Sequence, residues 1–487
     1  MRSQSDMNER IARRTFYGTV KIIDASPSRA YMGLGDCMLA LLILSLITVA
    51  EARPNLVIIM ADDLGWMDLG VQGNSAIDTP VLDAMAARGM RLSNGYAAAP
   101  VCSPTRAAMM TGLAPARLQI TNHAPGHPED FVPEGRPLSG APWIRHLGLD
   151  HETIAERLKE AGYATGFVGK WHLSHRPRRS QTEPLEGQLR PEHQGFDLNV
   201  GGCSFGGPPS YFAPYRNPAL KDGAEGEYLP DRLARECVDF IGQNRDQPFF
   251  LCWWNYSVHY PLQAPRDLVE KYDQRKGPGN ENPTYSAMIE GMDRSIGLLF
   301  EALERHELRE KTFVLFTSDN GSFGVDVAPL RGQKGYLWEG GLRVPWIVEW
   351  PGVVPAGVTC GVPVISMDVY PTLLELAGLE PRKVLDGLSL VSLLKGTGPL
   401  RRNTLYFHYP NYAFHKRNRL GSAIREGDYK LIRRYDDGSL ELYDLSNDLG
   451  ERINLADELP LFAQRLNGKL ARWLGKVGAA MPQRPSP

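Results

Sequence analysis

An almost continuous apolar run, NLVIIM at residues 55–60, limits the folds open to this chain more than any other segment. A strand that is apolar on both faces is typical of a parallel sheet covered by helices on both sides. Similar strand patterns recur at 163–168, 248–254 and 312–318, and helical patterns lie between them at 79–89, 151–162, 231–243 and 285–306. This alternation predicts an α/β fold in which helices sandwich a large mixed sheet.

The pattern changes near residue 395. Residues 422–434 and 440–445 have the composition of short antiparallel strands, and residues 459–475 have an amphipathic helical pattern. We therefore expect a smaller C-terminal α+β domain. The chain would then divide into an N-terminal signal region at 1–52, a catalytic domain at 53–395 and the C-terminal domain at 396–487.

The first 52 residues have the pattern of an export signal. Residues 38–50, MLALLILSLITVA, form an apolar run that is too short to span a bilayer comfortably. Ala50-Glu51-Ala52 follows as an A-x-A-like cleavage site. We predict cleavage near Ala52, a mature chain that begins at Arg53 in the periplasm or outside the cell, and no stable membrane span. A membrane anchor at the same run is the alternative.

Charge and cysteine content argue against two kinds of partner. The net charge is -2 and the pI is near 6.6, so there is no polybasic footprint for nucleic acid. The six cysteines include no C-x-x-C spacing, which argues against a zinc site. Export would permit disulfides, but the spacing leaves their pairing open.

Oxygen-rich pairs follow two of the predicted strands: Asp62-Asp63 and Asp319-Asn320. Ligands of open α/β sheets gather at the carboxyl ends of the strands. Three carboxylates and one amide oxygen suit Ca²⁺, with Mg²⁺ as the alternative. Clustered carboxylates would repel one another without a cation, although aspartates at strand ends also serve as turn formers.

Five motifs occur in order: RPNLVIIMADDLG at 53–65, CSPTRAAMMTG at 102–112, GYATGFVGKWH at 162–172, YSVHYPLQAP at 256–265 and SDNG at 318–321. Together they resemble the formylglycine-dependent (type I) sulfatases, arylsulfatase-like members of the alkaline phosphatase superfamily. The resemblance implies an alkaline-phosphatase-like fold and sulfuric ester hydrolase activity. One position departs from the pattern, because Leu113 stands where the segment usually ends in arginine.

The resemblance implies that Cys102 is oxidised to 3-oxoalanine (formylglycine) by a formylglycine-generating enzyme or an anaerobic maturase. One hydroxyl of the aldehyde hydrate would attack sulfur with the help of the metal and with Asp319 as base, leaving a covalent sulfo-enzyme. The second hydroxyl would then lose its proton to His172, and the collapse would release sulfate. A helix expected to begin at Pro104 would favour an anion near Cys102.

The resemblance gives the remaining groups supporting roles. Arg106 would hold the aldehyde hydrate, and Lys170 and Lys334 would bind sulfate oxygens. His259 would be the acid that protonates the leaving oxygen. The implied metal ligands are the residues already noted at the strand ends and the modified position: Asp62, Asp63, Cys102, Asp319 and Asn320.

The chemical class of the leaving alcohol is indicated by the residues near His259 and by one loop. Trp253, Trp254, Tyr256 and Tyr260 flank this histidine, and such rings either stack on sugars or fill a buried strand. Residues 201–215 form a Gly/Pro/aromatic loop of the type that shapes clefts. With export, these features favour a sulfated carbohydrate. The alternatives are a phosphonate or phosphate ester hydrolase of the same superfamily and an inactive carbohydrate-binding homologue.

Overall fold

The large sheet has eight strands and is mostly parallel, as the apolar runs predicted. The computed structural model describes residues 53–127, 131–175, 186–325, 327–413 and 418–484, so the predicted signal region and its cleavage site lie outside the described residues. The strand order is β5-β4-β6-β1-β7-β8-β2-β9. Strand β8 runs antiparallel to both β7 and β2, which makes the sheet mixed.

The central strands match the sequence predictions closely. The structure places β1 at Asn55–Ala61, β4 at Ala164–Gly169, β6 at Phe249–Trp254 and β7 at Thr312–Ser318. The outer strands are short and were not predicted: β2 at Met90–Leu92, β5 at Leu198–Val200, β8 at Trp346–Glu349 and β9 at Val358–Cys360.

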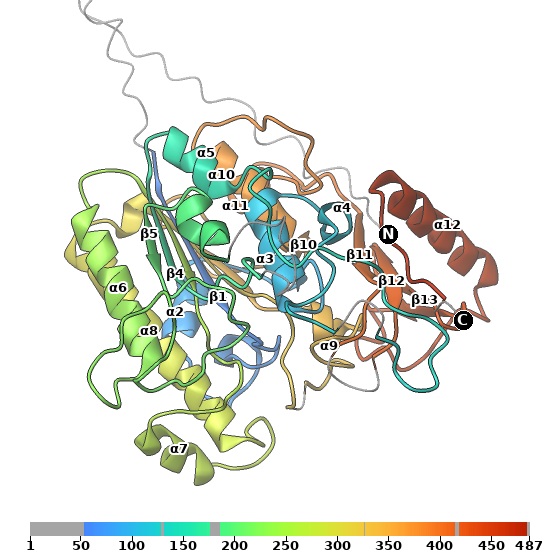
Figure 1. Cartoon of the computed structure of the whole chain (residues 1–487), viewed down its shortest axis with the longest axis horizontal. Coiled ribbons are helices and arrows are strands. Elements are labelled where there is room, and N and C mark those ends of the chain that lie inside the picture. Colours follow the sequence, from blue (N-terminus) through green and yellow to red (C-terminus); the bar gives the residue numbers. More distant parts are fainter. Residues whose placement is uncertain (1–52, 128–130, 176–185, 326, 414–417, 485–487) are drawn as a thin grey trace, which may run out of the picture. The chain divides into compact units, whose positions relative to one another are not determined.

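Helices cover both faces of this sheet (Figure 1). Alternate residues of β1 belong to two separate apolar cores, with Val57 and Ile59 in one and Leu56 and Ile58 in the other. The first core takes residues from α2 (Pro80–Arg88), α6 (Leu229–Gln243), α7 (Arg266–Asp273) and α8 (Pro283–Arg305). The second takes residues from α3 (Cys102–Thr111), α4 (Pro115–Leu118), α5 (Ile154–Glu160), α10 (Val369–Leu376) and α11 (Val391–Leu394).

A separate antiparallel sheet follows near the C-terminus. Its order is β11 (Thr404–Tyr409), β12 (Gly421–Glu426), β13 (Tyr429–Arg434) and β14 (Leu440–Asp444). Helix α12 (Pro460–Lys476) packs its leucines against one face of this sheet. The strands predicted at 422–434 and 440–445 are confirmed, whereas β11 was missed. The domain division at about residue 395 stays a prediction.

The other face of the small sheet contacts the segments that flank the start of α3. Phe407 and Ile432 share an apolar cluster with Tyr96, Val101 and Ala108. The same cluster includes Leu342 of α9 (Glu339–Leu342), and a two-stranded pair, β3 (Gly95–Tyr96) with β10 (Val364–Ile365), lies beside it. The C-terminal sheet therefore supports the backbone around Cys102 from behind.

Membrane-spanning helices and cysteine pairing can be examined in the described residues. Within them, no helix combines the length and hydropathy that a bilayer span requires. The five cysteines that the structure describes, Cys102, Cys203, Cys237, Cys252 and Cys360, are free thiols.

Candidate active site

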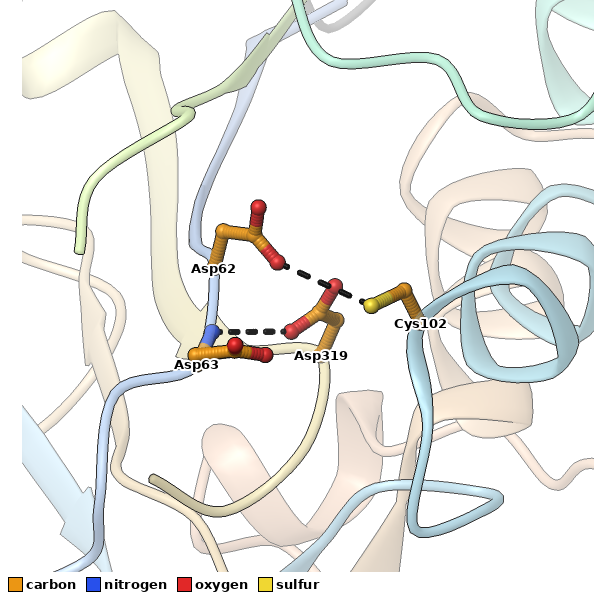
Figure 2. A group of neighbouring side chains, drawn as sticks. All are labelled: Asp62, Asp63, Cys102 and Asp319. Atoms are coloured by element: carbon orange, nitrogen blue, oxygen red, sulfur yellow. Dashed lines mark hydrogen bonds between the residues drawn. The ribbon is translucent and has the colours of Figure 1, made fainter. Parts of the chain in front are cut away.

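The two predicted metal pairs meet because their strands are neighbours in the sheet. Strands β1 and β7 run parallel with Ala61 in register with Ser318, so Asp62 and Asp319 follow at the same edge. The backbone N–H of Asp63 donates to Asp319 Oδ1 at 3.2 Å. Figure 2 shows the three carboxylates gathered beside Cys102, which enters from α3. The sheet edge thus builds the cluster from residues far apart in sequence.

Cys102 is the first residue of α3, so the helix begins two residues earlier than predicted. Its side chain is buried, and Sγ lies 3.8 Å from Asp62 Oδ1. The residue before it, Val101, gives the helix no side-chain cap, and the positive end of the helix dipole lies at Cys102. Burial raises the pKa of the Cys102 thiol to about 12, although Lys170 and Lys334 act in the opposite direction.

Arg106 lies one helical turn after Cys102 and joins the same cluster. Its Nη2 donates to Asp319 Oδ2 at 2.7 Å, and its Nη1 donates to the carbonyl of Lys170 at 2.6 Å. The guanidinium carbon lies 5.3 Å from the ring centre of Trp254. Arg106 therefore fixes the Asp319 carboxylate relative to the end of β4 while it remains fully buried.

Two lysines pair with the other two carboxylates. Lys170 Nζ lies 2.7 Å from Asp62 Oδ2, and Lys334 Nζ lies 2.7 Å from Asp63 Oδ1. Burial alone raises the pKa of Asp62, and the ion pair with Lys170 opposes this shift. Burial alone would also raise the pKa of Asp63, but Lys334 and His259 together lower it below its usual range.

The three aspartates are thus matched by three protein cations. Mutual repulsion of carboxylates, which the sequence suggested as a reason for a metal, does not by itself require one here. What fits an ion is the donor set. The ligand atoms of Asp62, Asp63, Cys102 and Asp319 all lie within 4.8 Å of one another. Asn320 adds a buried Oδ1 that has no hydrogen-bond partner among the described residues, so these residues could hold a hard divalent cation.

Hydrogen bonds to backbone carbonyls define the tautomers of the two predicted histidines. His172 Nε2 contacts the carbonyl of Ala124, so this nitrogen carries the proton. Its Nδ1 is buried and makes no hydrogen bond to any residue in the described part of the chain. His259 Nδ1 donates to the carbonyl of Tyr260 at 2.7 Å, and its Nε2 lies 3.7 Å from Asp63 Oδ2.

Asp63 and His172 share an unusual backbone conformation. Asp63 has φ 60° and His172 has φ 59°, both in the left-handed region that residues with a side chain seldom adopt. Such conformations cost about 1–3 kcal/mol each and persist where the surrounding structure enforces them. Asp63 follows the end of β1 by two residues and His172 follows the end of β4 by three, so both turns lie at the carboxyl edge of the sheet where the cluster forms.

A cavity of about 280 Å³ opens above Cys102. It is lined by Asp63, Cys102, His123, Ala124, His172, Gly206, His259, Tyr260, Phe323 and Lys334. The remaining predicted site residues, Asp62, Arg106, Lys170, Asp319 and Asn320, are buried beneath this surface. The sequence analysis missed His123 and Phe323, because neither stands at a fixed position of a motif, although Phe323 follows the SDNG motif by two residues.

The aromatic residues around His259 have mostly structural positions. Trp253 and Trp254 belong to β6 and are fully buried, and Tyr256 is buried with them. Only Tyr260, which is 42% exposed, lines the cavity. The expected loop at 201–215 does reach the cavity, through Gly206.

Comparison with known proteins adds the family context. The chain matches the family model described as Sulfatase over residues 54–379 and the model described as N-sulphoglucosamine sulphohydrolase, C-terminal, over residues 332–475. Arylsulfatase A of Homo sapiens is 34% identical over 465 residues, which cover 84% of each chain. N-acetylgalactosamine-6-sulfatase of Canis lupus familiaris is 34% identical over 393 residues, covering 74% of this chain and 69% of the relative.

Among solved structures, that of Ps i-CgsB in complex with k-i-k-neocarrahexaose superposes with a TM-score of 0.73 at 29% sequence identity. The match covers 89% of this chain and 94% of the other. The similarity therefore extends over both sheets and not over the motifs alone.

Proposed function

The chain belongs to the sulfatase family and is a sulfuric ester hydrolase, and from this we propose that it cleaves sulfate monoesters of a saccharide with a formylglycine made from Cys102. The observation that carries the proposal is the position of Cys102. It lies at an uncapped helix start, beside three carboxylates, and on the surface of a cavity that also exposes Lys334, His172 and His259.

The charges favour a divalent cation together with an anionic substrate. Three aspartates and three protein cations sum to zero formal charge. Asp62, Asp63, Asp319, Asn320 and the modified position 102 would hold Ca²⁺, or alternatively Mg²⁺, as a Lewis acid that polarises sulfate oxygens and lowers the pKa of a bound hydroxyl. The site would then carry excess positive charge, which suits a sulfate ester monoanion.

The protein's own groups divide the rest of the work. A formylglycine hydrate at position 102 would supply one hydroxyl to attack sulfur and a second to release the sulfate. Lys334, which lines the cavity, and Lys170 beneath it would pair with sulfate oxygens. Arg106 and Asp319 form a buried ion pair under the nucleophile, and we propose that Asp319 accepts the hydroxyl proton from this fixed position although the pairing lowers its pKa.

The tautomers support different roles for the histidines. With Nε2–H donated to Ala124, His172 offers a lone pair on Nδ1, as a base that receives the second hydroxyl proton requires. With Nδ1–H donated to Tyr260, His259 directs Nε2 toward the cluster. We propose that this nitrogen protonates the leaving oxygen once an anionic substrate favours the imidazolium form.

Several features support a saccharide as the leaving alcohol. N-acetylgalactosamine-6-sulfatase, a relative, is named for a sulfated sugar, and Ps i-CgsB was solved with a neocarrahexaose. The predicted export would bring the enzyme into contact with extracellular polysaccharide. Because Cys102 is only 1% exposed, the proposed maturase would have to act on the chain before it folds.

The deciding experiment is mass spectrometry of the peptide that contains Cys102, combined with the Cys102→Ser variant. We expect the peptide mass of an aldehyde in place of the thiol. The variant should fold and lose about 10³-fold or more of its turnover of 4-nitrophenyl sulfate. Cys360→Ser is the matched control, since Cys360 is a free cysteine in β9, and it should keep full activity.

Undiminished turnover in Cys102→Ser would overturn the nucleophile. The same assay with a phosphonate monoester and a phosphate diester separates the alternative hydrolase, which would prefer those esters over the sulfate. An intact thiol at Cys102 together with binding of sulfated sugars but no turnover would indicate the inactive carbohydrate-binding homologue.

A further inference from the structure

A side chain of the loop at 201–215 reaches the segment that carries His259. Tyr211 is fully buried in the apolar core that also takes residues from α6 and α8. Its hydroxyl contacts the segment between β6 and α7, in which His259 lies. The proposed chemistry assigns no role to Tyr211, although it contacts the residue that would protonate the leaving oxygen.

The Tyr211 hydroxyl lies in hydrogen-bonding contact with two backbone carbonyls of one turn. It contacts the carbonyl of Tyr256 and lies 2.9 Å from the carbonyl oxygen of His259. Burial raises the pKa of Tyr211 well above its usual range, so the phenol keeps its proton and acts as the donor. Within the part of the chain that the structure describes, no backbone N–H reaches the His259 carbonyl. The phenol is therefore the group that holds this carbonyl in place.

The backbone of Tyr211 is itself held on both sides. Its N–H donates to Gln263 Oε1 at 2.8 Å, and its carbonyl accepts from the N–H of Leu229, at the start of α6, at 2.8 Å. Gln263 lies in the same segment as His259, between β6 and α7. The ring thus projects from an anchored backbone, which keeps its hydroxyl at the turn.

The first half of this turn is bonded to the charged cluster instead. The N–H of Asp62 donates to the carbonyl of Ser257 at 2.8 Å, and the N–H of Val258 donates to the carbonyl of Asp62 at 2.6 Å. These backbone bonds would remain if the phenol were removed. The second half of the turn, at the His259 carbonyl, depends on Tyr211.

The peptide that follows His259 also governs its ring. The ring Nδ1 donates to the carbonyl of Tyr260, the next residue, at 2.7 Å, and Nε2 lies 3.7 Å from Asp63 Oδ2. Tyr260 is joined to the peptide unit whose oxygen Tyr211 contacts. Loss of the phenol would let this unit rotate and carry the ring with it. A displacement of about 1 Å at a reacting group can cost about 100-fold in rate.

We propose that Tyr211 is a positioning residue, whose hydroxyl holds the turn that carries His259 so that Nε2 can protonate the leaving oxygen. This inference rests on the proposed function and deepens it, because it makes the loop at 201–215 part of the support of the acid. Tyr211 lies outside the cavity lining, so it would act only through His259.

Leaving groups of different basicity separate this role from a general structural one. A basic leaving oxygen requires a proton in the transition state more than a weakly basic one does. The esters are 4-nitrophenyl, 3-nitrophenyl and phenyl sulfate, in order of rising basicity of the phenolate, and kcat/KM is measured for each. The proteins are the unmodified enzyme, Tyr211→Phe, His259→Ala, the double variant and the control Tyr228→Phe.

Tyr228→Phe is a matched control for the loss of a buried phenol oxygen. Tyr228 lies in the same apolar core, with its ring centre 6.4 Å from that of Tyr211. Its hydroxyl is buried and has no hydrogen-bond partner among the described residues. The substitution therefore removes the same atom without breaking a contact, and it should change kcat/KM by less than about twofold on every ester.

For Tyr211→Phe we expect a loss of kcat/KM that grows with the basicity of the leaving phenolate, from about threefold on 4-nitrophenyl sulfate to about 30-fold on phenyl sulfate. His259→Ala should show the same trend more strongly. In the double variant the Tyr211 substitution should add less than about twofold, since the phenol acts through the missing histidine. Tyr211→Phe keeps the buried ring, and thermal unfolding checks that each variant is folded.

Three results would overturn the inference while leaving the role of His259 intact. Equal losses of Tyr211→Phe on all three esters, or no loss, would mean that the phenol does not act through the proton donor. A further loss of about tenfold in the double variant would mean that it acts on another group. The same trend in Tyr228→Phe would mean that any change in this core produces it.

The remaining outcomes separate this inference from the proposed function. If His259→Ala showed no dependence on the leaving group, the acid role of His259 and the inference would both fail, while the sulfatase function stood. If the unmodified enzyme hydrolysed no sulfate ester, the proposed function itself would be refuted.

Discussion

At the scale of single residues, two glycines determine how closely the cavity wall approaches the histidines. A Cβ on Gly206 would lie 2.9 Å from His172 Nε2, and a Cβ on Gly207 would lie 2.6 Å from His259 Nδ1. Carbon atoms essentially never come so near a ring nitrogen. The Gly/Pro/aromatic loop noted in the sequence therefore serves to seat both histidines.

Gly207→Ala should displace the ring of His259, because the new methyl group also approaches the carbonyl of Tyr260 to which Nδ1–H donates. The backbone of Gly207 has no positive φ, so the variant should fold normally. We expect kcat for 4-nitrophenyl sulfate to fall about 10- to 100-fold, since small misplacements of a reacting group are costly, and the melting temperature to fall by a few degrees because the methyl group overpacks the loop.

Gly475→Ala is the control for this substitution. Nothing lies within 4 Å of the Cβ that it would add to α12, and alanine is the better helix former. Its activity should not change. If Gly207→Ala also kept its activity within about twofold, close packing of this loop would not be what holds His259.

At the scale of elements, the agreement between sequence and structure follows strand length within the large sheet. The long strands and helices around the site were found within a few residues, because each carries a full period of apolar residues. Strands β2, β5 and β9 have three residues each and were missed. Their positions are determined by neighbouring strands and not by a local pattern.

Helix α5, which leads into β4 and so to Lys170 and His172, begins with a capping box. Thr153 Oγ1 accepts from the N–H of Glu156 at 3.2 Å, and Glu156 Oε2 accepts from the N–H of Thr153 at 2.7 Å. The Thr153 hydroxyl also donates to the buried carbonyl of Gln194 at 2.8 Å. The Thr153 hydroxyl therefore acts as both a hydrogen-bond acceptor and a donor.

Thr153→Ala should lower the free energy of unfolding by about 1–2 kcal/mol, because it leaves the first turn and the Gln194 carbonyl without their partner. Chemical denaturation measures the change. Thr153→Ser keeps the hydroxyl and should recover most of the stability. Equal stability of the alanine and serine variants would show that the cap contributes little.

At the scale of the whole described chain, a buried ionic cluster joins the C-terminal sheet to the segment that carries Lys334. Lys430 is in β13, and its Nζ lies 2.9 Å from Glu339 Oε1 and 2.9 Å from Glu451 Oε1. All three side chains are buried. Burial alone would raise the pKa of Glu339, but Lys430, with Arg343 and Arg425, lowers it to about 2. The lysine thus keeps a carboxylate charged inside the protein.

Lys430→Met should destabilise the protein by about 3–5 kcal/mol, because it leaves Glu339 and Glu451 buried without their shared cation. The unfolding free energy from denaturant titration is the measurement. Lys311→Met, at an exposed lysine before β7, should change it by less than about 0.5 kcal/mol. A loss below about 1 kcal/mol in Lys430→Met would mean that the cluster does not hold the C-terminal sheet to α9.

The sequence by itself determined the family, the central strands and the order of the charged groups. Asp62, Asp63, Asp319 and Asn320 could be placed together because parallel strands end at one edge of a sheet. Cys102, Arg106, Lys170, His172 and His259 stood in fixed motifs, and Lys334 came from the family resemblance. The structure brings all six into or beneath one cavity. Their chemical roles stay predictions until the variants are measured.

Only the tertiary structure decided which side chains line the cavity. His123, Gly206, Tyr260 and Phe323 come from four separate loops, and no local pattern links them. The same packing buried Trp253 and Trp254 in the core and left Tyr260 in the cavity, and it brought the carbonyl of Tyr412 to Asn122. Periodicity and motifs are local signals, whereas a cavity wall is formed by loops whose contacts are made only when the chain has folded.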